Sequence, residues 1–163
     1  MIYEFDVEGT IVGKQRPRVN KYTNQVYTPN RTKDYELLVQ QSFKIKYPRH
    51  DMINGRVAVE ITAYMKIPRS TSKNLIDDML AGNISPTKKP DVDNIAKSIL
   101  DAMNQYVFKD DNQVSKVTVE KKYGEIEKVH IKKRGIDFPL LLVLICPVVF
   151  CWNLSNIFLY FFW

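Results

Sequence analysis

The chain has 163 residues and carries 24 Lys and Arg against 18 Asp and Glu, a formal net charge of +6. This length suits one domain with a single core and is too short for two. A basic globular protein favours a polyanionic partner, nucleic acid first and an acidic membrane second, although the charge also suits a basic protein without such a partner. Both cysteines, Cys146 and Cys151, lie near the C-terminus and the two histidines stand apart, so neither a disulfide framework nor a zinc site is expected.

Strands and helices alternate along the first half of the chain. Residues 3–7 alternate apolar with acidic side chains, which predicts a half-buried strand and argues against a signal peptide, so we expect a cytoplasmic protein. A basic loop with the character of a hairpin follows. Thr28 and Pro29 then offer the N-cap and first turn of a helix that reaches about Tyr47. A long strand is predicted over residues 57–65.

The second half begins with a short helix or ordered loop that Gly82 ends. Apolar residues at helical spacing predict a helix over residues 94–105, and a turn follows it. Residues 117–119 and 129–131 indicate two further strands, with Gly124 between them as a possible hairpin turn.

This order of elements predicts a single α+β domain over residues 1–135, with a mixed or antiparallel sheet and helices packed on it. Residues 136–163 are apolar and aromatic and lie outside this predicted fold. Their length suits a bilayer span, and Lys132, Lys133 and Arg134 precede them as in a membrane anchor, whereas Asn and Ser interrupt them. Three roles are compatible with this tail: membrane contact, an appendage without selected function, or a packing or oligomer element.

Five aspartates gather within one short stretch of an otherwise basic chain. They are Asp91, Asp93, Asp101, Asp110 and Asp111. Because residues i and i+2 of an extended segment point to the same side, Asp91 and Asp93 are expected to aim at one point, with the helix opening at Asn94. Asp110 and Asp111 follow the helix on a turn that we expect to fold back towards the helix start. Converging carboxylates repel one another unless a hard divalent cation, Mg²⁺ or Mn²⁺, binds them.

Such an ion can bind a phosphodiester and activate water, and Lys97, one helical turn after Asp93, could neutralise the phosphate in the transition state. Ordinary structural roles are also compatible with these residues. Asp93 could be an N-cap, Asp101 could be the surface partner of Lys97, and residues 109–113 could be a common turn.

Basic residues precede this acidic stretch in the sequence. Those expected to contact DNA phosphates are Lys14, Arg16, Arg18, Lys21, Lys88 and Lys89. A solvated charged loop is the alternative for the first four of them.

The stretch KPDVDNIAKSILDAMNQYVFKDDNQV resembles the signature of the RusA family of Holliday junction resolvases. That signature is D-x-D-N-x-x-K, a helix, an aspartate and a D-D-x-Q-V turn, and the distance from helix to turn is slightly shorter here. The matching residues are Asp91, Asp93, Asn94, Lys97, Asp101, Asp110, Asp111, Gln113 and Val114. The opening GTIVGKQRPRV also resembles phage-borne members, so the likeness covers residues 1–133, and the tail resembles nothing in the family.

The resemblance implies a homodimeric, Mg²⁺-dependent endonuclease, without a small-molecule cofactor, that nicks two strands symmetrically across a four-way DNA junction in recombination and repair. The residues that it implies as catalytic are Asp91, Asp93, Lys97 and Asp111. The metal ligands that it implies are Asp91, Asp93, Asp111 and Asp110, with Asp101 secondary. Two alternatives stay open: a metal nuclease acting on another branched DNA, and a non-catalytic DNA-binding module whose acids are caps and turns.

Overall fold

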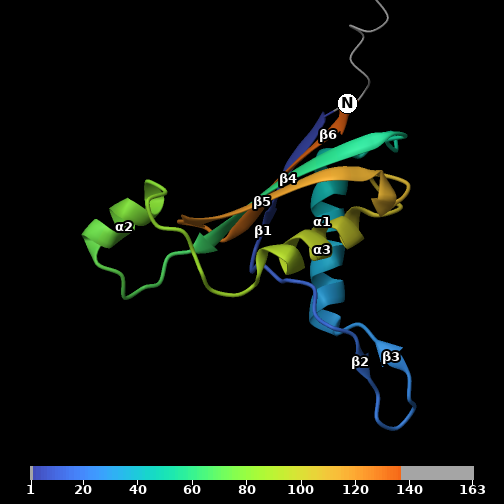
Figure 1. Ribbon diagram of the computed structural model, residues 1–163, viewed down its shortest axis with the longest axis horizontal. Coiled ribbons are helices and arrows are strands. Elements are labelled where there is room, and N and C mark those ends of the chain that lie inside the picture. The colour runs from blue at the N-terminus through green and yellow to red at the C-terminus, as the bar shows by residue number, and fades with distance from the viewer. Residues whose placement is uncertain (1, 137–163) are drawn as a thin grey trace, which may run out of the picture.

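The computed structural model describes residues 2–136, which form a four-stranded mixed sheet with two long helices on one of its faces (Figure 1). The strands are β1 (Ile2–Glu8), β4 (Arg56–Lys66), β5 (Val114–Gly124) and β6 (Lys128–Ile136). The sheet order is β1-β6-β4-β5, in which only the β4–β5 pair is parallel. The helices on the covered face are α1 (Asn30–Lys46) and α3 (Val92–Met103). The predicted α+β class is confirmed.

The expected hairpin between the last two strands is wrong. β5 and β6 do not pair with each other, because β4 lies between them. Their connection passes the end of β4, where a Cβ on Gly124 would lie 3.2 Å from the Cβ of Tyr64. An alternating apolar pattern indicates which face of a strand is buried, but it does not indicate which strand lies next to it in the sheet. β4 buries Val57, Val59 and Ile61 completely, which suits a central strand with partners on both edges.

Several element boundaries differ from the sequence prediction by one or two residues. α1 has Pro29 at its N-cap rather than in its first turn, and α3 starts at Val92 rather than Asn94. Asp91 is the N-cap of α3 with an extended backbone (φ −74°, ψ 153°), so Asp93 already belongs to the helix. The expectation that Asp91 and Asp93 share one extended segment is therefore wrong.

The outer elements agree with prediction. A small hairpin, β2 (Arg18–Val19) with β3 (Val26–Tyr27), extends away from the body at the bottom of Figure 1. The short helix α2 (Lys73–Leu80) is followed by Gly82 with φ +84°. Glycine favours that left-handed conformation at a helix end because it has no Cβ.

The two faces of the sheet differ in character. Tyr3, Phe5 and Val7 of β1 face the core, while the acidic residues between them face outward and meet basic residues of β6. Lys132 Nζ lies 3.2 Å from Glu4 Oε2, and its hydrogen bond lowers the pKa of Glu4. The alternation in β1 thus encodes an apolar side for the helices and a charged outer side.

One charged residue of the described part of the chain lies in the core. Lys133 of β6 is completely buried, and its Nζ donates a 3.1 Å hydrogen bond to the carbonyl of Val107. The same Nζ lies 5.6 Å from the ring centre of Tyr3 and 5.3 Å from that of Phe108. Burial lowers the pKa of Lys133 to about 8. Lys133 therefore ties β6 to the segment that follows α3.

No helix within residues 2–136 is long and apolar enough to cross a bilayer. β6 runs to Ile136, one residue past the predicted domain boundary. The roles predicted for the tail concern residues that, apart from Ile136, lie outside the described part of the chain.

Candidate active site

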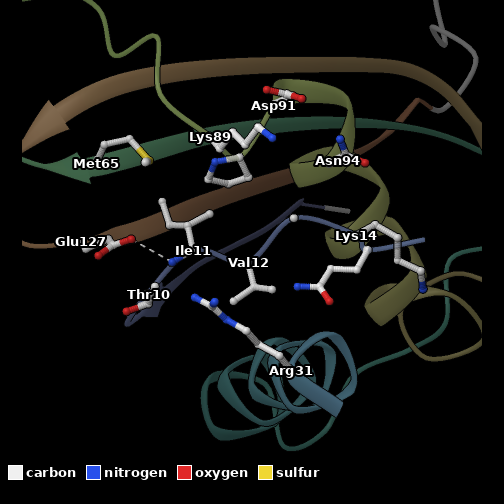
Figure 2. A pocket seen from close by; sticks show the side chains of 13 residues that line it. Thr10, Ile11, Val12, Lys14, Arg31, Met65, Lys89, Asp91, Asn94 and Glu127 are labelled. Atoms are coloured by element: carbon white, nitrogen blue, oxygen red, sulfur yellow. Dashed lines mark hydrogen bonds between the residues drawn. The ribbon is translucent and has the colours of Figure 1, made fainter. Parts of the chain in front are cut away.

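A cleft of about 540 Å³ opens at the N-terminal end of α3 (Figure 2). It is lined by Thr10, Ile11, Val12, Gly13, Lys14, Gln15, Arg31, Met65, Lys89, Pro90, Asp91, Asn94 and Glu127. These residues come from the segment after β1, the start of α1, the end of β4, the residues at the start of α3 and the β5–β6 connection. The cleft thus joins the predicted basic loop to the first predicted metal ligand, Asp91.

Backbone contacts fix the segment after β1 against the start of α3. The amide of Lys14 donates a 2.8 Å hydrogen bond to the carbonyl of Asn94. A Cβ on Gly13 would lie 2.8 Å from the Cβ of Pro90 and 2.9 Å from the Cβ of Asn94, so glycine is required for this approach. On the other side, the amide of Ile11 donates to Glu127 Oε1 at 3.0 Å.

The contacts of Lys14 differ from the DNA phosphate contact that was expected for it. Its Nζ lies 2.6 Å from Glu36 Oε1 and 2.5 Å from Asp101 Oδ2. Partial burial disfavours the ammonium, but these two carboxylates raise the pKa of Lys14 above its ordinary value. Lys14 is therefore better explained as an anchor of the loop than as a phosphate contact. Asp101 pairs with Lys14, and Lys97 lies beside Asp93 instead, at 3.6 Å.

The acidic pair at the start of α3 is open to solvent. Within residues 2–136, no hydrogen bond or ion pair engages the carboxylate of Asp91. Asp93 lies beside Lys97, and its Oδ1 accepts a 3.4 Å hydrogen bond from the side-chain Nδ2 of Asn94. The side chains of Asp93 and Lys97 are 60% and 63% exposed, and such pairs contribute less than about 1 kcal/mol. Both carboxylates can therefore turn towards a ligand at low cost.

The second acidic pair lies on a tightly hydrogen-bonded turn. Asp110 caps the short 3₁₀ helix η1 (Asp111–Gln113), and its Oδ1 accepts a 2.9 Å bond from the amide of Asn112. Gln113 accepts from the amide of Asp110 at 3.1 Å and donates to the carbonyl of Gly55 at 3.1 Å. The structural alternative for this turn is thus correct for Asp110, and Gln113 fixes the turn to the start of β4. The role of Gln113 was missed in the sequence.

The turn does not fold back to the start of α3, contrary to expectation. Because β5 runs parallel to β4 and begins beside Val57, the preceding turn must lie at the start of β4. Asp91 and Asp111 therefore lie towards opposite ends of α3, whose 12 residues span about 18 Å.

This separation bears on metal binding. Ligand oxygens lie only about 2.0–2.6 Å from a bound Mg²⁺ or Ca²⁺, so Asp91 and Asp111 of one chain do not share an ion in this arrangement. Within residues 2–136, no three carboxylate, imidazole or thiolate side chains converge. The donor chemistry of the exposed aspartates fits a hard divalent cation, but one chain alone does not assemble three such donors.

Most of the predicted DNA-contacting residues are exposed. They are Arg16, Arg18, Lys21, Lys88 and Lys89. Arg31, Met65 and Glu127, which complete the cleft, were missed because no local pattern marks them. Lys121 was missed for the same reason. Its Nζ donates a 2.5 Å hydrogen bond to the carbonyl of Lys88 and so fixes the segment that precedes α3.

Exposed paired aspartates beside basic surface residues suit metal-assisted chemistry on a phosphodiester backbone. A family model described as Endodeoxyribonuclease RusA matches residues 8–133, and the chain therefore belongs to the RusA family. It is also similar to the "Uncharacterized protein YqaN" of Bacillus subtilis (strain 168), with 32% identity over 138 residues that cover 82% of this chain and 96% of that protein. The RusA family comprises Holliday junction endodeoxyribonucleases, which in general depend on a divalent metal.

Proposed function

We propose that this protein is a Mg²⁺-dependent endonuclease that resolves four-way DNA junctions by paired, symmetric nicks in recombination and repair. The observation that carries the proposal is the exposed Asp91–Asp93 pair at the start of α3, which packs against the segment leading to the basic hairpin, in a member of the RusA family. Mn²⁺ is the expected substitute for Mg²⁺, since both prefer oxygen ligands.

Each residue of this site has a proposed role. Asp91 and Asp93 bind the metal from the start of α3, and Asp111 contributes a further carboxylate, with Asp110 beside it. A divalent ion held there would supply Lewis-acid chemistry and lower the pKa of water for attack on the phosphodiester. Lys97, now beside Asp93, neutralises charge that develops on the phosphate. Arg16, Arg18 and Lys21 on the hairpin arm, with Lys88 and Lys89, contact the DNA backbone.

We propose that the protein acts as a homodimer, in which the second chain would complete each metal centre. Within one chain, α3 separates Asp91 and Asp93 from Asp111. A symmetric pair of chains can place Asp111 of each beside the aspartate pair of the other, because a two-fold contact repeats every pairing. Such a dimer has two equivalent centres, which matches two symmetric nicks.

The direct test of function compares a synthetic four-way junction with a linear duplex of the same sequence, in Mg²⁺ and in chelator. We expect paired nicks in the junction only, lost with chelator and absent in Asp91→Asn. Equal cutting of the duplex, or preferential cutting of a three-way or flapped substrate, would favour the metal nuclease with another target.

Two observations favour the non-catalytic alternative: Asp110 serves as a cap, and Asp93 is the ion-pair partner of Lys97. A DNA-binding module would bind the junction equally well in Mg²⁺ and chelator and leave every strand intact. Denaturing gels of the same reactions separate this outcome from nuclease activity.

A further inference from the structure

The cleft beside Asp91 contains groups that the proposed phosphodiester chemistry does not use. We propose that this cleft holds one nucleotide of the bound DNA strand, turned out of its base stack next to the phosphate that is cut. This inference rests on the proposed function and assigns a substrate subsite to the same centre.

The position of the cleft links it to the reacting phosphate. Asp91 lies at its rim together with Lys89 and Asn94, and Arg31 reaches towards the cleft from α1 on the opposite side (Figure 2). A phosphate near Asp91 therefore has its neighbouring nucleotide within reach of the cleft. The exposed side chains of Lys89 and Arg31 place positive charge on both sides of the path from Asp91 into the cleft, which favours a negatively charged DNA backbone.

The size and apolar part of the lining suit a base. The volume of about 540 Å³ lies in the range of small-molecule sites, roughly 300–1,000 Å³. The apolar lining residues are Ile11, Val12, Met65 and Pro90. Bases taken out of a stack are held between apolar or aromatic side chains. Met65 and Pro90 are half-buried and provide most of this surface, because Ile11 and Val12 are largely buried in the core.

The polar part of the lining suits the edge of a base. Gln15 and Asn94 carry amides that can both donate and accept hydrogen bonds. Glu127 uses Oε1 to accept from the amide of Ile11, which leaves its second oxygen for a ligand. A purely apolar ligand would leave these groups unpaired, and a free anion would meet the Glu127 carboxylate. A nucleotide satisfies both halves of the site, with its base inside and its phosphate near Lys89 and Arg31.

A base can reach this cleft only when it leaves its pair, because a concave site excludes the convex surface of a duplex. Unpairing costs free energy, and this cost is lowest where pairing is already disturbed. The base pairs at the branch point of a junction lose part of their stacking. The cost of unpairing is therefore lower at the place where this enzyme acts. The cleft would then contribute to the choice of both structure and sequence.

The test places the fluorescent base 2-aminopurine, in turn, at each position within three nucleotides of the nick. The full-length protein binds these junctions in chelator, so that the strands stay intact. We expect a several-fold rise in fluorescence at one position adjacent to the nick, where the base leaves its stack. Met65→Trp and Gln15→Trp, which fill the cleft from two places, should abolish that rise while junction affinity changes by less than about fivefold, because phosphate contacts supply most of the binding.

Ile45→Trp is the matched control. Ile45 is 83% exposed, and it lies 14 residues after Arg31 on α1, or about 21 Å along the helix axis. This variant adds the same ring outside the cleft and should keep both the rise and the position at which it occurs. Thermal melting of each variant verifies that it is folded.

Three outcomes would overturn the inference. If the wild type nicks junctions but no position brightens, the cleft does not hold an unstacked base. If both folded cleft variants brighten as the wild type does, the unstacked base lies elsewhere. If the wild type nicks no junction at all, the proposed function fails and this inference fails with it.

Discussion

The two ends of α3 carry similar acidic pairs but use them differently. At the N-terminal end, the Asp91 carboxylate has no partner within residues 2–136, and Asp93 makes one long, exposed ion pair. At the C-terminal end, Asp110 caps η1, and Gln113 ties the turn to Gly55. The first end is thus free for a ligand, whereas the second is a hydrogen-bonded scaffold that presents Asp111. Similar acidic pairs can therefore be open to a ligand at one position and serve folding at the other.

The largest effect is expected at the free end. Asp91→Asn should abolish nicking while junction binding persists or tightens, because the change removes a proposed metal ligand and a negative charge but leaves the basic surface intact. Gel-shift and cleavage assays with the same labelled junction measure both properties. Near-normal nicking by this variant would remove Asp91 from the metal site.

Lys97→Ala should lower kcat by about 10²-fold or more, with little change in junction affinity, if Lys97 neutralises charge in the transition state. Its ion pair with Asp93 is exposed, so the loss of folding stability should stay below about 1 kcal/mol. Single-turnover rates and thermal melts separate these effects. Comparable rates for variant and parent would assign Lys97 a merely structural role.

Substitutions in the basic segment of the hairpin, at Arg16 and Arg18, and at Lys14, which anchors that segment, should affect DNA binding and stability in opposite ways. Arg16→Ala combined with Arg18→Ala should weaken junction binding and flatten the slope of log K against log[salt] by about one to two units. Lys14→Ala should lower the melting temperature, since Glu36 and Asp101 lose their shared cation, and should leave that slope nearly unchanged. A changed slope for Lys14→Ala alone would return Lys14 to the DNA surface.

Lys133→Met should change the pH dependence of stability. Burial lowers the pKa of Lys133 from 10.5 to about 8 in the folded state, so between these values the unfolded chain binds a proton that the folded chain does not. The free energy of unfolding therefore rises with pH across this window, and the cost of the buried ammonium is present in full below pH 8.

Methionine removes that cost while the carbonyl of Val107 keeps its bond from the amide of Ile53. The variant should gain about 1–2 kcal/mol at pH 7 and lose the rise between pH 8 and 10.5. Denaturant unfolding of both proteins across this range measures the difference. An unchanged pH profile would mean that Lys133 does not titrate in this window.

The smallest effect is expected for substitutions of Asp110, near the C-terminal end of α3. Asp110→Ala should cost about 1 kcal/mol of stability because η1 loses its cap, whereas Asp110→Asn keeps a good capping group and should stay near the parent. If Asp110→Asn retains stability but loses nicking, Asp110 also binds metal. Equal stability of all three proteins would contradict the capping role.

The sequence predicted features that depend on nearby residues. Alternation in β1 and β4, apolar spacing in α1 and α3, and the turn chemistry around Asp110 are local, and each corresponds to an element of the structure. The neighbours of a strand are not local: β5 and β6 carry patterns that suit a hairpin, yet both pair with β4.

The same limit applies to the site. The aspartates were expected to converge because they are close in sequence, but the parallel pairing of β5 with β4 places the second pair at the far end of α3. The pairing of Lys14 with Glu36 and Asp101, and the place of Arg31, Met65 and Glu127 in the cleft, arise only when distant segments pack together. No spacing rule along the chain marks such contacts.

The most direct test of a metal centre shared between two chains mixes the variants Asp91→Asn and Asp111→Asn and lets their subunits exchange. If each centre combines Asp91 of one chain with Asp111 of the other, the mixed dimer has one fully mutated centre and one intact centre. We predict that each variant alone is inactive and that the mixture regains nicking of single strands in the junction. No recovered activity despite proven subunit exchange, or full activity of Asp111→Asn alone, would contradict a metal centre shared between two chains.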